Sequence, residues 1–157
     1  MSIVNGANLT QTYAALGAET PAVGDHFVGP GGKVYKFVQY TTAVGPVAAV
    51  VGNVCYYYAP AGVSAGATGV VTSDLSDSAG VGAGVLQSAP ANNEYCWVQI
   101  MGPATLNTAL TAGADGNALT ATGATDGTLD VSAAVTDSIV AYAIDASAKI
   151  VMCSFPW

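Results

Sequence analysis

The hydrophobic positions of this chain form short runs rich in Val, Thr and Tyr, separated by glycine and proline. No stretch keeps the 3.6-residue apolar period of an amphipathic helix over three turns without an intruding glycine. This punctuation is typical of a β protein with many tight turns. We therefore expect an all-β fold, a compact sandwich or barrel of about ten to twelve short, mostly antiparallel strands.

The individual strands are predicted from runs of apolar and β-branched residues between turn signals. These runs are 27–28, 34–40, 47–51, 54–58, 69–72, 81–87, 94–101, 104–110, 118–121, 128–131, 138–144 and 149–155. A Gly/Pro cluster at 29–32 and the short polar segment 145–148 each predict a hairpin. Asp115-Gly116 and Asp126-Gly127 predict turns, and Gly102-Pro103 is expected to end the run 94–101.

The run 94–101 differs from the others because both of its alternating faces are largely apolar. One face carries Tyr95, Trp97, Gln99 and Met101, and the other carries Glu94, Cys96, Val98 and Ile100. Since successive side chains of a strand point to opposite faces, this pattern predicts a strand that is covered on both sides.

The length of 157 residues favours one domain, which we place at residues 24–157, preceded by an extended N-terminal arm at 1–23. A soft boundary is expected within 60–80, a stretch rich in Gly, Ala and Ser. The first residues lack a basic region followed by an apolar stretch, which argues against a secretory signal and favours synthesis in a cytoplasm.

The low charge content of the chain bears on its function rather than on its fold. Only 8% of the residues are charged, none is arginine, and the net charge is −7. Three lysines cannot form the basic patch that nucleic acid or an anionic membrane surface requires. Because charge normally keeps a free monomer soluble, this surface suits a protein whose outside contacts other protein subunits.

Catalytic and metal-binding patterns are weak throughout the chain. The segment 62–66 matches G-x-S-x-G, but Pro60 precedes it, a glycine-rich stretch follows, and the single histidine lies upstream. His26 is expected at the surface or in an interface beside a turn, and Asp74 and Asp77 are expected in a solvated turn. We predict no enzyme activity, no catalytic residue, no cofactor and no metal.

The three cysteines have neither the number nor the spacing of a disulfide framework or a zinc site. Each has apolar or aromatic neighbours, which predicts that Cys55, Cys96 and Cys153 are buried thiols. The aromatic segments around Tyr56-Tyr57-Tyr58 and Tyr95/Trp97 allow two interpretations, a sugar-stacking platform or core and interface packing.

The two ends of the chain supply the candidate interface residues. The sequence closes on Phe155-Pro156-Trp157, which predicts that Phe155 and Trp157 dock onto the same chain or onto a neighbour. An extended N-terminal arm would reach an adjacent subunit through its apolar residues. The candidate interface residues are Ile3, Val4, Leu9, Tyr13, Phe155 and Trp157.

Three segments carry a resemblance to a known family. They are GPGGKVYKFV at 29–38, EYCWVQIMGP at 94–103 and DSIVAYAIDA at 137–146. Together they resemble the capsid decoration (cement) proteins and related head proteins of tailed bacteriophages. The resemblance implies a β-rich protein on the capsid exterior that binds as a homotrimer and clamps neighbouring subunits of the major capsid protein. It carries over no catalytic residue.

The alternative is another virion component, such as a tail- or fibre-associated β-domain able to bind a host glycan. In either case the expected location is the virion, after synthesis in the host cytoplasm. Copy number and position on the particle distinguish the two.

Overall fold

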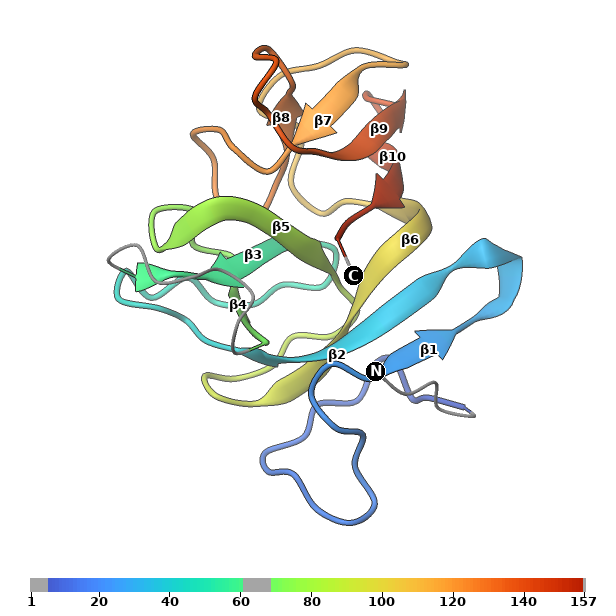
Figure 1. Cartoon of the computed structure of the whole chain (residues 1–157), viewed down its shortest axis with the longest axis vertical. Helices are drawn as coiled ribbons and strands as arrows, with labels where there is room; N and C mark the ends of the chain where they lie inside the picture. The colour runs from blue at the N-terminus through green and yellow to red at the C-terminus, as the bar shows by residue number, and fades with distance from the viewer. Residues whose placement is uncertain (1–5, 61–68, 157) are drawn as a thin grey trace.

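The computed structural model describes residues 6–60 and 69–156 and confirms the all-β prediction (Figure 1). In these residues it contains ten strands and one 3-10 turn. They are β1 (His26–Val28), η1 (Pro30–Gly32), β2 (Val34–Tyr40), β3 (Val54–Tyr58), β4 (Val70–Thr72), β5 (Ser78–Leu86), β6 (Tyr95–Thr105), β7 (Ala118–Thr120), β8 (Asp130–Val131), β9 (Ile139–Asp145) and β10 (Ile150–Ser154). The hairpins predicted around 29–32 and 145–148 are both present.

Five of these strands form a closed barrel. Their order is β2-β4-β3-β5-β6, and the pairing of β2 with β6 joins the first strand to the last. The β2–β4 pair is parallel, and the other four pairs of this ring are antiparallel. Closure removes the unpaired edges that an open sheet of these strands would expose.

Strand β6 continues out of the barrel and links it to the remaining strands of the ten-stranded sheet. Its residues 95–101 pair with β2, while 101–105 pair with β10, which is followed by β9, β7 and β8. We call β7–β10 with the second half of β6 the C-terminal sheet, which lies above the barrel in Figure 1. The architecture therefore changes within β6, and the soft boundary expected within 60–80 stays a prediction because 61–68 lie outside the described residues.

Two predictions about the region after residue 101 were wrong. Gly102-Pro103 does not end the strand, because Gly102 adopts a φ of +89° and lets the backbone continue from one sheet to the other. The separate strand expected at 104–110 does not exist: Ala104 and Thr105 complete β6, and 106–110 are irregular.

The strand predicted at 47–51 is also absent. Residues 47–50 have no regular structure, Val51 lies in a turn, and Val50 and Val51 are exposed. The barrel strands already have partners on both sides, so this apolar run finds no free edge on the barrel.

The core confirms the two-sided burial expected for β6. Cys96, Val98 and Ile100 face a large cluster that fills the barrel and continues beneath the C-terminal sheet. On the opposite side, Trp97 packs with Tyr35 and Phe37 in a second cluster. The cover over this second cluster comes from the N-terminal part of the chain.

The described part of the expected arm does not extend away from its own domain. Residues Ala7, Leu9 and Tyr13 pack on the second cluster, and Tyr13 forms an isolated antiparallel bridge with Tyr95. Residues 14–19 are all exposed and belong to a loop that leaves the barrel before β1. Residues 7–13 contain no helix or strand beyond the single bridge at Tyr13, so their position depends on the apolar surface beneath them.

Candidate interface

The structure uses the described interface candidates within their own chain. Leu9 and Tyr13 are half-buried against the second cluster, and Phe155 is only 2% exposed. The backbone N–H of Phe155 donates to the carbonyl of Ile100, which fixes the chain end against β6. Phe155 therefore docks onto the same chain, one of the two expected outcomes. The candidates Ile3, Val4 and Trp157 lie outside the described residues.

The aromatic residues of the second cluster form a compact group, which we call the aromatic cluster. Its members are Phe27, Tyr35, Phe37, Tyr95 and Trp97. The rings of Phe37 and Trp97 meet edge to face with centroids 5.1 Å apart, and the rings of Phe37 and Tyr95 stack at 6.2 Å. Such pairs stabilise beyond their buried area by about 0.5–1.5 kcal/mol each.

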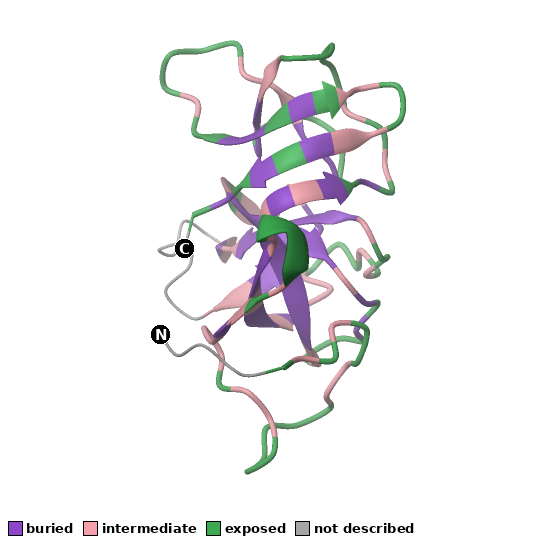
Figure 2. Ribbon diagram, turned by 90° about the vertical axis from the view of Figure 1, so that its right-hand side faces the viewer, coloured by how far each residue is buried: buried purple, intermediate pink, exposed green. Residues whose placement is uncertain are grey.

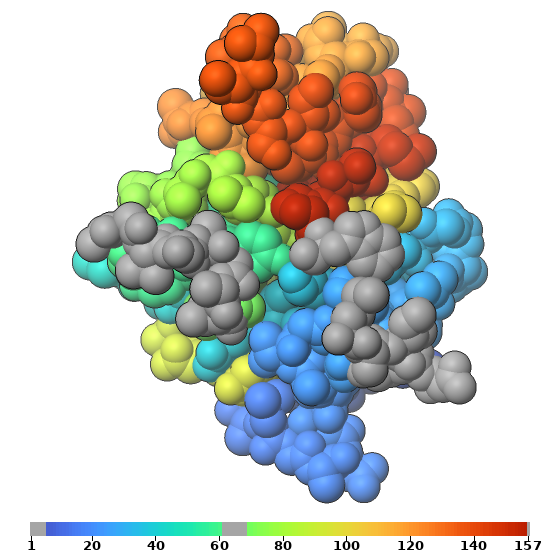
Figure 3. Space-filling view, in the orientation of Figure 1, coloured from blue at the N-terminus to red at the C-terminus, as the bar shows by residue number. Residues whose placement is uncertain are grey.

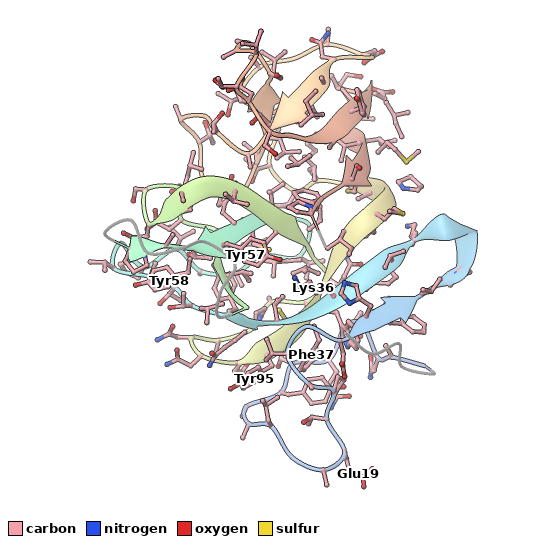
Figure 4. The ribbon with its side chains drawn as sticks, in the orientation of Figure 1. Glu19, Lys36, Phe37, Tyr57, Tyr58 and Tyr95 are labelled. Carbon is pink, nitrogen blue, oxygen red and sulfur yellow. The ribbon has the colours of Figure 1, made fainter. Side chains whose placement is uncertain are left out.

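The sugar-stacking interpretation of the aromatic segments was wrong for most of its residues. Tyr56 and Trp97 are fully buried and Tyr57 is 4% exposed, so their ring faces are covered by protein. Tyr58 and Tyr95 are half-buried and belong to different parts of the barrel, as Figure 4 shows.

A different surface has the character of an interface: the outer face of the C-terminal sheet. The strand registers place Pro103, Met152, Tyr142 and Ala118 directly opposite one another in a row across β6, β10, β9 and β7. Tyr142 is 48% and Met152 is 42% exposed, while Pro103 and Ala118 are partly exposed. The row contains no carboxylate, ammonium or imidazole group, so it is apolar across four strands.

The neighbours of this row extend the apolar surface. Ile144 and Ile139 on β9 are each 45% exposed, and Ile150 on β10 is partly exposed. Figure 2 views this face, and exposed positions alternate with buried ones along β10. The charged groups of this hairpin, Asp145 and Lys149, lie at its turn. Backbone and hydroxyl donors at Ala148 and Ser147 lower the pKa of Asp145, which keeps this carboxylate ionised at the turn.

The orientation of β9 explains why sequence reasoning missed this surface. Ala141 and Ala143 face the core, whereas the larger Tyr142 and Ile144 face outward. A strand that alternates alanine with large apolar residues has two apolar faces, as the run 94–101 does. Two apolar faces predict that β9, like β6, is covered on both sides. The described residues of this chain leave the second face open, since Tyr142 and Ile144 remain exposed.

Polar side chains of β1, β2 and β3 lie close together. Lys36 on β2 donates to the Tyr57 hydroxyl on β3 at 2.6 Å, and His26 lies opposite Lys36 in the β1–β2 register. His26 is 3% exposed, so the surface position expected for it was wrong: the hairpin turns this side chain inward. Burial and the nearby Lys36 ammonium both lower the pKa of His26.

The three cysteines and Asp74 lie in buried positions. Cys55, Cys96 and Cys153 are free and buried as predicted, and burial raises the pKa of Cys96 and Cys153 to about 12. Asp74 was expected in a solvated turn, which was wrong: it is 3% exposed, and its carboxylate accepts hydrogen bonds from the backbone N–H and the hydroxyl of Ser76. The described residues contain no group of three or more His, Cys, Asp or Glu positioned to hold a metal ion. The G-x-S-x-G segment lies outside them.

Comparisons with known proteins add no relative to this picture. No family model, no curated protein and no solved structure matches the chain. The part of the chain that the structure describes contains no helix long and apolar enough to cross a membrane.

Proposed function

We propose that this chain is a structural protein of a virion, a decoration protein that binds the outer surface of a phage capsid and stabilises contacts between major capsid subunits. The observation that carries the proposal is the apolar outer face of the C-terminal sheet, with Tyr142 and Met152 at its centre. In this proposal the major capsid protein covers that face. The protein acts by binding and has no catalytic step.

The chemistry of the face supports docking to a protein surface. The centre of a protein interface is depleted of charged residues and enriched in aromatic residues and Met, which is the composition found here. Exposed apolar patches rimmed by polar residues are typical of interaction sites. The row lies on paired strands, so it is held rigidly and its shape does not need to form on binding.

The modest size of the face fits a lattice better than a single tight complex. A stable two-protein interface removes about 800 Å² from each partner, more than a few half-exposed side chains supply. On a capsid, many copies bind repeated sites, and any protein that binds only the assembled state stabilises it by mass action. Weak individual docking is sufficient for that role.

The charge distribution of the whole chain is consistent with the same role. A net charge of −7 comes from 13 charged side chains in 157 residues, which leaves large areas of uncharged surface. The family resemblance of segments 29–38, 94–103 and 137–146 adds the expectation of homotrimers and of a position on the capsid exterior.

The test is a cryo-EM reconstruction of the particle that carries this protein. We expect its density at repeated sites over the head, with the outer face of the C-terminal sheet turned toward the shell. Density confined to the tail or fibres would replace the proposal with the alternative virion role. Density on the head with Tyr142 and Met152 turned to solvent would refute the assignment of the docking face.

A further inference from the structure

We propose a second interaction surface that is independent of the capsid role. The outer side of the aromatic cluster is an acceptor for residues 7–13 of a second copy of this chain, so that neighbouring copies exchange their N-terminal segments. We call residues 7–13 the strap. The structure shows the strap seated on its own barrel, and the same contacts are available to the strap of a neighbour.

The strap is held by a small and local set of contacts. Tyr13 and Tyr95 exchange two backbone hydrogen bonds of 2.9 and 2.8 Å. The ring of Tyr13 meets the ring of Phe37 edge to face at 5.5 Å, and Ala7 and Leu9 pack on the same cluster. All of these contacts join the strap to β2 and β6. A strap from another copy, placed in the same register, would reproduce each of them.

The acceptor surface needs a cover at all times. Phe37 and Trp97 are fully buried beneath the strap and its surroundings, and Tyr35 is 5% exposed. Loss of the strap would expose large aromatic side chains to water, which is strongly unfavourable. Since exchange replaces one strap with an identical one, it keeps this cover and is a low-cost route to association.

The linker between the strap and β1 is longer than its seated position requires. Tyr13 lies along one edge of β6, and Gly24 bonds to Phe37 at the far edge of β2, a separation of roughly three strand spacings or about 14 Å. The linker residues 14–24 can span about 36 Å when extended.

The linker also leaves the body of the molecule. Residues 14–19 are exposed, and the bonds at Gly17–Thr20 and Ala22–Asp25 are local turns. Figure 4 places Glu19 at the tip of this loop, far from Phe37 and Tyr95, and Figure 3 shows the loop projecting from the lower end of the molecule. Such a linker can lead the strap to a neighbouring copy.

One polar group of the aromatic cluster has no hydrogen-bond partner while the strap is seated. The indole N–H of Trp97 is buried and has no hydrogen-bond partner in the structure. Buried N–H groups are normally paired, because an unpaired one loses its bond to water without replacement. A strap bound in the same register leaves this group unpaired in either arrangement, so the group does not favour the strap of its own chain over the strap of a neighbour.

The test is a disulfide between the strap and its acceptor. Tyr13 and Tyr95 form a hydrogen-bonded antiparallel pair, in which the Cα atoms lie about 5.5 Å apart and within disulfide range. The variant Tyr13→Cys/Tyr95→Cys is refolded as a mixture of ¹⁵N-labelled and unlabelled chains and then oxidised. We expect peptides in which residue 13 of a labelled chain is joined to residue 95 of an unlabelled chain. The single variants Tyr13→Cys and Tyr95→Cys are the controls.

Disulfides found only within chains would overturn the proposal. If the double variant fails to fold, p-benzoylphenylalanine at Tyr13 keeps an aromatic ring on the cluster and provides a photo-crosslink in the same labelled mixture. Crosslinks between chains to peptides containing Phe37 or Tyr95 support exchange, and crosslinks within chains only overturn it. The experiment uses the purified chain without particles, so its outcome is separate from that of the capsid proposal.

Discussion

The apolar row on the C-terminal sheet leads to a prediction that separates docking from folding. The variant Tyr142→Ser/Met152→Ser removes the two most central side chains of the row and leaves the strand pairing of β9 and β10 in place. Both side chains are exposed in part, so they are available to a partner. We expect a large loss of docking in a protein that still folds.

The magnitude follows from the area that docking would bury. Tyr142 is 48% exposed, and an aromatic side chain buries about 150–250 Å², so about 100 Å² remains to be covered. At about 25 cal/mol per Å² this area contributes about 2.5 kcal/mol, and the 42% exposed Met152 contributes a similar amount. Allowing for imperfect burial in an interface, we expect a loss of about 3 kcal/mol, or roughly a hundredfold in affinity.

The effect on folding follows from the covered part of the same two side chains. Tyr142 and Met152 are each about half covered by their own chain, so at the same coefficient their truncation removes about 2–4 kcal/mol of stability. For a chain of this size, 1 kcal/mol corresponds to about 2–4 °C in Tm. The double variant should therefore melt roughly 5–15 °C below the wild type, and its binding is measured well below that midpoint.

The assay is co-sedimentation of the purified protein with particles that lack it, together with thermal unfolding of the free protein. The matched control is Val44→Ser/Val51→Ser, which removes side chains that are 78% and 55% exposed but lie in the barrel loop 41–52. The reasoning is refuted if the double variant binds within threefold of the wild type, or if the control variant loses as much affinity.

Three further predictions concern stability. Phe155→Ala removes a ring that is 2% exposed and should destabilise the fold by about 3–5 kcal/mol, which thermal unfolding would register as a Tm lower by roughly 10 °C; a shift under 2 °C would contradict its place in the core. Tyr56→Phe removes a hydroxyl that donates to the carbonyl of Thr128 and accepts from its N–H, so denaturant unfolding should show a loss of stability of about 1–3 kcal/mol. The matched control is Tyr58→Phe, which removes a tyrosine hydroxyl from the same strand without breaking these two bonds. Folding lowers the pKa of His26 from 6.5, so the unfolded chain binds a proton at this imidazole more readily than the folded one. The contribution of His26 to stability should therefore be full above pH 6.5 and should fall as the pH drops toward the lower pKa of the folded state. His26→Gln should flatten that part of the pH profile while leaving the loss below pH 3.8, where the lowered pKa values of Asp137 and Asp145 act; an unchanged slope below pH 6.5 would contradict this assignment.

Local patterns in the sequence were sufficient to predict several elements. The hairpins β1–β2 and β9–β10 depend on turn residues at 29–32 and 145–148, which act within a few residues of the chain. The double-sided burial of β6 followed from its two apolar faces. Burial of the three cysteines followed from their apolar neighbours.

Long-range pairing decided what these patterns could not. The run 47–51 resembles a strand locally, but the closed ring of β2 to β6 leaves it no edge. Gly102 and Pro103 resemble a terminator, but β10, about fifty residues later, pairs across them and keeps the strand intact. The positions of His26 and Asp74 were decided in the same way, by the elements packed around them rather than by their neighbours in sequence.

The candidate interface illustrates the same division. The sequence determined that β6 and β9 each have two apolar faces, because side-chain direction in a strand depends only on position. The tertiary structure decided which of these faces is covered within the chain: the strap covers Trp97, while the described residues leave Tyr142 and Met152 exposed. A hydrophobic pattern predicts which strand faces favour burial. Only the folded arrangement of distant segments determines whether the chain itself or a partner covers each face.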